Sequence, residues 1–222
     1  MYTLHYVPDW ASLAVRLTLE EFSIPYEAAL VDNEVNERDS SAFRRMSPLG
    51  LIPAFSTPDG DMCETVAILL WLGDQHPEVS PGAASRDRAA YLKWLVFINN
   101  SVHNNILALF HPERVSSMTC STETMGNARA QIQQALAIVD SMVASDAPCW
   151  LDAEKPTALN YYLALLMRWM NGFDHSHPAH ISSREYPALH EMLLKLETRP
   201  AALTCAKLEG LGETIFTQPT LV

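Results

Sequence analysis

The chain has 222 residues, of which 48% are hydrophobic, and a formal net charge of -11 at pH 7. This apolar share can build a substantial core, and the length fits one large or two small domains. The acidic balance argues against nucleic acid as a partner, because proteins that bind its phosphate backbone concentrate lysine and arginine. The longest apolar run, AILLWLG, is too short to span a bilayer, and no basic leader precedes MYTLHYV. We expect a cytoplasmic globular protein with no membrane partner.

The cysteines and histidines do not have the spacing of a metal site. Four cysteines are far apart along the chain, with no CxxC pair, which favours reduced thiols. The stretch HSHPAH carries His175, His177 and His180, but it lacks an acidic or thiol fourth ligand. We therefore expect three solvated histidines and no metal.

Strand and helix patterns alternate in the first third of the chain. Residues 2–6 and 26–31 are typical of strands, and a helix is expected between them at 10–22. IPAFSTPDGDMC is typical of two strands around a Pro-Asp-Gly turn, and TVAILLWLGDQHP of a helix. The expected order is βαβ, then a helix, then ββα.

The remainder of the chain is predicted to be helical. PEVSPGAASRD has the composition of a linker, and the long amphipathic stretch RDRAAYLKWLVFINNSVHNNILALF follows it. PTALNYYLALLMRWM is apolar on nearly every side, as expected for a buried helix, whereas HPERVSSMTCSTET has no period and predicts a mobile loop. We predict an α/β domain at 1–77, a linker at 78–85 and an all-helical domain at 86–222.

Four motifs in the same order resemble those of the cytosolic glutathione S-transferases. SPLGLIPAF and CETVAILLWLGDQHP resemble the family's glutathione-site signature. PTALNYYLA resembles its helix-capping box, with Asn160 in place of aspartate, and YPALHEMLLKLETRPAALTCAKLEGL resembles its last helices. The resemblance covers almost the whole chain. It implies a thioredoxin-like domain followed by a helical bundle, glutathione as co-substrate without a metal, and a homodimer.

The stretch YVPDWASLA looks most like the bacterial beta class, which carries Tyr-x-Pro-Gly-Ala-Cys-Ser-Leu-Ala at this position. Tyr6, Pro8 and Ser12 match, but Ala11 replaces the active-site cysteine. This loss disfavours reductase chemistry. SVHNN places His103 where the beta class has a histidine that faces its active site, and a contact to glutathione or substrate is implied.

The resemblance assigns four residues to glutathione binding. Pro53 is a candidate cis-proline, and a cis bond would turn the backbone N–H and C=O of Ile52 toward the ligand. Glu64 and Thr65 stand where a strand ends and a helix begins. Thr65 can cap that helix, whose free N–H groups suit a carboxylate, and Glu64 can pair with the α-ammonium of glutathione.

Two hydroxyl groups are candidates to donate a hydrogen bond to the glutathione sulfur. A free thiol has a pKa of about 8.5, and a helix N-terminus or a hydrogen-bond donor promotes its ionisation. Ser12, in the first helical turn, offers both, while Tyr6 matches the tyrosine that other classes of the family use; we prefer Ser12 slightly. Asp9 is expected to cap the helix, and Trp10 to line the electrophile pocket or cover the interdomain seam.

The leading hypothesis is an enzyme that conjugates the glutathione thiolate to a small apolar electrophile held between the domains. One alternative is a glutathione-binding or partner-binding module with little catalysis, which the altered residues 9–11 favour. Another is a glutathione-dependent peroxidase, isomerase or dehalogenase, which would direct the same thiolate to a different substrate.

Overall fold

The computed structural model describes residues 1–117 and 120–222 of the chain, and it begins with a mixed four-stranded sheet. The elements of this N-terminal part are β1 (Tyr2–Tyr6), α1 (Ser12–Glu21), β2 (Tyr26–Leu30), η1 (Glu37–Asp39), α2 (Ser41–Met46), β3 (Ala54–Thr57), β4 (Gly60–Cys63) and α3 (Thr65–Gln75). The strand order is β2-β1-β3-β4. The expected βαβ, helix, ββα order is confirmed.

Strand pairing brings the candidate residues of the N-terminal part to one end of the sheet. β1 runs parallel to β2, which requires the α1 crossover, and antiparallel to β3. β3 and β4 form a hairpin in which Ala54 faces Cys63. The residues just before Ala54 and just after Cys63 therefore flank the same end of the sheet, close to where β1 leads into α1.

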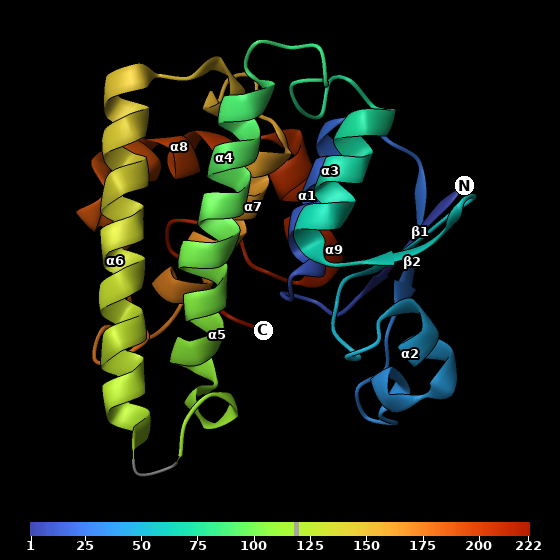
Figure 1. Ribbon diagram of the computed structural model, residues 1–222, viewed down its shortest axis with the longest axis horizontal. Coiled ribbons are helices and arrows are strands. Elements are labelled where there is room, and N and C mark those ends of the chain that lie inside the picture. The colour runs from blue at the N-terminus through green and yellow to red at the C-terminus, as the bar shows by residue number, and fades with distance from the viewer. Residues whose placement is uncertain (118–119) are drawn as a thin grey trace.

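The helical part follows an irregular stretch after α3. Its elements are α4 (Arg88–Ile98), η2 (Asn99–His103), α5 (Asn104–Phe110), η3 (Pro112–Arg114), α6 (Ser121–Asp146), η5 (Cys149–Leu151), α7 (Ala158–Asn171), η6 (Ser183–Glu185), α8 (Pro187–Glu197) and α9 (Pro200–Glu209). In Figure 1 the sheet lies on one side, α4 to α6 stand on the other, and α1, α7 and α9 lie between them. No helix in the described part of the chain is long and apolar enough to cross a membrane.

Two sequence expectations in the helical part need correction. The long helix expected over 86–110 is not uniformly α-helical, because η2 inserts a π-helical turn between α4 and α5. The loop expected over 111–124 is also shorter than predicted, since α6 already begins at Ser121. Residues 118–119 of that predicted loop lie outside the described residues.

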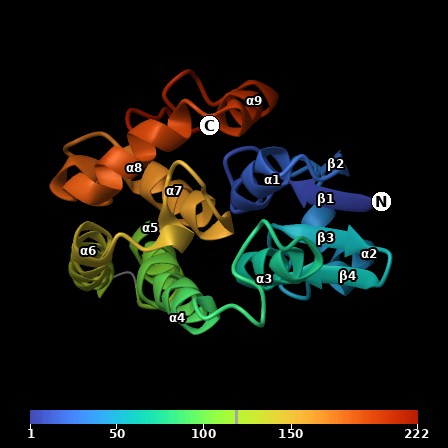
Figure 2. The same cartoon turned by 90° about the horizontal axis from the view of Figure 1, so that it is seen from above.

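One apolar core spans both parts of the chain. It runs from β1, α1 and α3 into α4 to α9, and α7 has the predicted buried position, with 12 of its 14 residues buried. Figure 2 shows α1 and α7 side by side between the sheet and the outer helices, in agreement with their contacts. The two parts are therefore joined by packed side chains and not by the linker alone.

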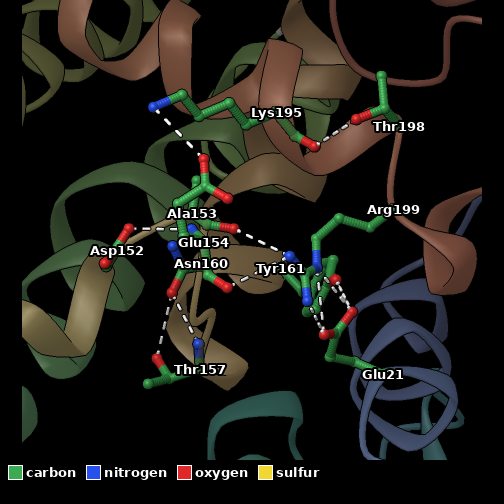
Figure 3. Close-up of polar contacts among 10 residues, drawn as sticks. All are labelled: Glu21, Asp152, Ala153, Glu154, Thr157, Asn160, Tyr161, Lys195, Thr198 and Arg199. Atoms are coloured by element: carbon green, nitrogen blue, oxygen red, sulfur yellow. Dashed lines mark hydrogen bonds and ion pairs between the residues drawn. The ribbon is translucent and has the colours of Figure 1, made fainter.

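An ion pair supports this seam at the C-terminal end of α1. Arg199 Nε lies 3.1 Å from each oxygen of the Glu21 carboxylate, and Arg199 Nη2 lies 2.5 Å from Oε1. The Tyr161 hydroxyl donates to the same carboxylate, and Figure 3 shows the three side chains converging. A hollow of about 270 Å³ beside Arg199 is lined by Ala153, Glu154, Lys195, Thr198, Arg199 and Pro200.

The capping box at the start of α7 is confirmed. The Thr157 side chain accepts from the first turn, and Asn160 Oδ1 accepts from the Thr157 backbone N–H at 2.8 Å. Asn160 is fully buried. Its amide thus performs the task of the aspartate that the family usually carries.

We expect Asn160→Ala to lower the free energy of unfolding by about 1–3 kcal/mol, because it removes a cap and leaves a buried backbone N–H without a partner. Urea denaturation measures this change. The matched control is Gln134→Ala, an exposed helix position on α6, which should stay within about 0.5 kcal/mol of the parent. Equal stability of the two variants would contradict the capping role.

Candidate active site

The proline loop lies at the sheet end identified above. The Ile52–Pro53 peptide bond is cis, as the resemblance to the family implied. Ile52 is buried in a small apolar cluster with Val7, Val31, Phe43 and Ala54. Because Val7 begins the segment between β1 and α1, this cluster holds the proline loop against that segment.

The start of α3 flanks the proline loop. Glu64 is the N-cap residue, with φ 71° and ψ 111°, and its side chain is exposed. Thr65 is buried and is the first helical residue, so the expectation that Thr65 caps the helix is wrong; no side chain caps α3 in the described structure. The N–H groups of the first turn are therefore uncapped, next to an exposed carboxylate.

The segment between β1 and α1 also differs from expectation. The N-cap of α1 is Ala11, and no side chain caps this helix either. Asp9 does not cap it: its carboxylate is buried and bonded to Arg168 of α7, with Nε–Oδ1 at 2.7 Å and Nη2–Oδ2 at 2.9 Å. Asp9 binds Arg168 and does not cap the helix because a bidentate guanidinium is a stronger partner for a carboxylate than a backbone N–H. This pairing neutralises the charge that would oppose a nearby thiolate.

The two hydroxyl candidates differ in environment. Ser12 is the first residue of α1, is fully buried, and donates its hydroxyl to Val7 O at 3.2 Å. Tyr6 is partly buried, and the Arg16 guanidinium stacks over its ring at 3.8 Å from the centroid. Arg16 in turn pairs with Glu209 of α9, so the Tyr6 ring lies against the α1–α9 contact.

Trp10 packs on the N-terminal part. Its ring is partly buried against the cluster that contains Ile52, and the Arg38 guanidinium lies 4.8 Å from its centroid. The members of that cluster all belong to the first 54 positions. Trp10 thus stands beside the proline loop, and its electrophile-pocket role stays a prediction.

His103 ends the π-helical turn and belongs to a hydrogen-bonded chain. Its Nδ1 lies 2.8 Å from the Tyr162 hydroxyl, which donates to Asn99 Oδ1 at 2.9 Å. Because that hydroxyl proton is used on Asn99, His103 Nδ1 must carry the donor hydrogen. Burial lowers the pKa of His103 to about 4, so the ring is neutral and Nε2 is a hydrogen-bond acceptor.

Electrostatic coupling shows that the two parts of the chain face each other here. Burial, followed by the negative charge of Glu64, raises the pKa of the Tyr162 hydroxyl. The exposed carboxylate of the α3 N-cap therefore acts on Tyr162 of α7, the hydrogen-bond partner of His103. The His103 ring also lies 5.6 Å from the Trp169 ring, centroid to centroid, and Trp169 Nε1 donates to Asp9 O at 2.7 Å.

Sequence reasoning missed the partners from α7. Arg168, Trp169 and Tyr162 bind the segment before α1 or orient His103. The sequence predicted no role for Arg168, and it allowed the two aromatic residues a place in the electrophile pocket only as an alternative to the core. One signal was available. A lone arginine in an otherwise apolar helix is seldom buried without a charged partner.

The histidine stretch after α7 also differs from expectation. His175 and His177 are exposed, but His180 is buried and bonded to Phe173 O and to His175. The His180 ring is therefore not solvated, because its hydrogen bond to the Phe173 carbonyl closes the turn between these two residues. Among the described residues, no group of three or more His, Cys, Asp or Glu side chains could hold a metal ion.

Comparison with known proteins agrees with this fold. Residues 1–74 match the family model "Glutathione S-transferase, N-terminal domain". The glutathione S-transferase GST-4.5 of Xanthomonas campestris is 24% identical over 169 residues, which are 75% of this chain and 81% of that protein. A sphingomonad glutathione S-transferase solved in complex with glutathione is 29% identical, with a TM-score of 0.76 over 95% of this chain and 100% of that one.

A beta class glutathione S-transferase of Sphingomonas chungbukensis has a TM-score of 0.75 at 24% identity, over 94% of this chain and 98% of that one, and supports the fold alone. The mixed sheet with its cis-proline loop, followed by the helical bundle, is the fold of the glutathione transferases. Residues 1–74 thus form a glutathione S-transferase N-terminal domain, and the chain is similar to glutathione S-transferases over 95% of its length, in agreement with the resemblance of its motifs.

The His103 environment predicts an unusual titration. We expect its imidazole resonances, assigned by their loss in His103→Gln, to titrate at about pH 4 in an NMR series. The unfolded chain binds this proton near pH 6.5. Stability should therefore fall as the pH drops from about 6.5 to 4, by up to about 3 kcal/mol more in the parent than in His103→Gln. Titration of the ring near 6.5 would contradict its burial.

Proposed function

We propose that the protein is a glutathione transferase that joins the thiolate of glutathione to a small apolar electrophile. Family membership alone does not establish an activity, since one fold hosts many functions. The observation that carries the proposal is the uncapped start of α3, with exposed Glu64 as its N-cap residue, beside the cis-proline loop. This arrangement suits a ligand with both carboxylate and ammonium groups.

The proposed glutathione contacts divide by charge. The N–H groups at the start of α3, which include that of Thr65, bind the carboxylate of the γ-glutamyl group, because a helix N-terminus favours an anion. Glu64 pairs with the ammonium group of the same residue. The backbone of Ile52, before Pro53, pairs with the peptide as an added strand. His103 Nε2, an acceptor in the neutral ring, receives an N–H of glutathione.

The proposed chemistry takes place at the start of α1. A thiolate there is favoured by the start of α1, which no side chain caps, and by a hydroxyl donor. Ser12 is the preferred donor, and its hydroxyl would have to turn from Val7 O toward the sulfur; Tyr6 is the alternative. The thiol proton passes to solvent, the sulfur forms a bond to the electrophilic carbon, and the leaving group departs with its electron pair. Trp10 is proposed to form part of the electrophile site.

A second candidate function is a glutathione-binding module with little catalysis. The specific observation in its favour is the burial of Ser12, whose hydroxyl already donates to a backbone carbonyl. A hydroxyl that stays on this carbonyl cannot stabilise the sulfur. A peroxidase, isomerase or dehalogenase would use the same thiolate, and a substrate screen distinguishes these from a conjugating enzyme.

The decisive measurement is the ultraviolet difference spectrum of glutathione bound near neutral pH, which detects thiolate. We expect a thiolate band in the parent. Ser12→Ala should raise the pKa of the bound thiol by about one to two units, because a hydrogen bond to a charged group contributes about 1.5–3 kcal/mol. Conjugation at pH 7 should fall accordingly.

The matched control is Tyr6→Phe, which should retain the band. The opposite pattern, with the band lost in Tyr6→Phe alone, would assign the sulfur to the tyrosine. Saturable binding without a band in the parent would indicate the binding module, and absence of binding would refute the proposal.

We further propose that the protein is a homodimer, as its family resemblance implies. Gel filtration coupled to light scattering should give a mass close to twice the 24.7 kDa of one chain. A mass of one chain at micromolar concentration would refute the dimer without bearing on glutathione binding.

A further inference from the structure

Asp9 is held entirely by the helical part of the molecule. Its N–H donates to Glu209 Oε2 at 2.9 Å, and its C=O accepts from Trp169 Nε1 at 2.7 Å. Its carboxylate bonds twice to Arg168 and accepts the Val222 N–H at 3.1 Å. Every polar group of this residue in the N-terminal part thus has a partner from α7, α9 or the C-terminal segment.

The same arginine holds the C-terminal segment. Arg168 Nη1 donates to Ile215 O and Nη2 to Thr220 O, each at 2.8 Å. We call residues 211–222 the C-terminal strap. Asn171 Nδ2 donates to two further strap carbonyls, at residues 216 and 217, and Glu197 accepts from both backbone N–H groups there. Figures 1 and 2 both place the end of the chain between the two parts.

The backbone at Asp9 depends on these partners. Its φ of 62° lies in the left-handed region, which is strained for a residue with a Cβ atom. The beta class motif has glycine at this position, where such a conformation is free of strain. Here the aspartate adopts it, and the bonds to Arg168, Glu209 and Trp169 hold it there.

We propose that the C-terminal strap, through Arg168 and Asp9, positions the segment of residues 9–12 that receives the glutathione sulfur. The inference rests on the proposed function, because Ser12 and the first N–H groups of α1 follow Asp9 directly. Asp9 and Arg168 are positioning residues: they touch no reacting atom. They set the direction in which the first turn of α1 presents its donors.

Substitution of a single glycine can test the strap without replacing Asp9 or Arg168. A Cβ at Gly172, the C-cap residue of α7, would lie 2.6 Å from Leu221 Cδ2 and 2.7 Å from Leu221 Cγ. The φ of Gly172 is -81°, which any residue adopts. Gly172→Leu therefore forces the Leu221 side chain out of its place, and we expect the larger leucine side chain to displace the end of the strap as well. Gly126→Leu is the matched control, because nothing lies within 4 Å of its Cβ position.

The experiment measures amide hydrogen exchange and steady-state kinetics on the full chain. We expect Gly172→Leu to speed exchange at the strap amide of Val222 and also at Asp9, whose N–H lies in the segment before α1. We expect kcat to fall about five- to tenfold with little change in the KM for glutathione, since misplaced donors affect the transition state more than binding. Gly126→Leu should change neither.

A deletion of residues 219–222 provides a second variant, in case Gly172→Leu folds poorly. It removes Thr220 and Val222 from Arg168 and Asp9, and the same exchange and kinetic changes are expected. Rapid exchange at the strap with unchanged protection at Asp9 and unchanged kcat would overturn the inference. Failure of the parent to ionise bound glutathione would instead refute the proposed function, and exchange at Asp9 would still report on the strap.

Discussion

The ion pair between Asp9 and Arg168 is the interaction on which the arrangement of the site depends. Its side chains are 4% and 0% exposed, so water and salt screen it little. Arg16 and Glu209 form a second buried pair beside it, 3.1 Å apart, and burial raises the pKa of Glu209. Removing one member of such a pair typically costs about 3–5 kcal/mol, because the other charge stays buried without a partner. The start of α1 is thereby fixed relative to α7 and α9.

This rigidity has a functional consequence, since the candidate site draws groups from both parts of the chain. The N-terminal part contributes two helix starts without side-chain caps, at α1 and α3, and the cis-proline loop between them in space. The helical part contributes the neutral His103 ring. In a protein of net charge -11, helix starts supply the local donors that an anionic ligand needs, without clusters of lysine or arginine.

The changes from the beta class motif form one coherent set. Ala11 takes the place of the cysteine and is the N-cap residue of α1. Asp9 takes the place of a glycine and acquires a buried arginine as partner. A glycine position, which is conformationally permissive, is thus replaced by a residue that is hydrogen-bonded to the helical part. Trp10, on the other side of the segment, packs toward the proline loop.

The sequence by itself determined the order of strands and helices, because each element depends on neighbours within a few residues. The cis Pro53 and the capping box of Thr157 and Asn160 were predicted from motifs that resemble those of the family. It did not determine the hydrogen-bond partners of Asp9, Thr65 and His180. Asp9 and Thr65 were expected to cap helices and His180 to be solvated, and these three expectations were wrong. Asp9 and Arg168 are 159 positions apart, and only packing of α1 against α7 brings them together. The partner of a buried charge is chosen by competition among all groups that the fold places within reach, and that competition exists only in the tertiary structure.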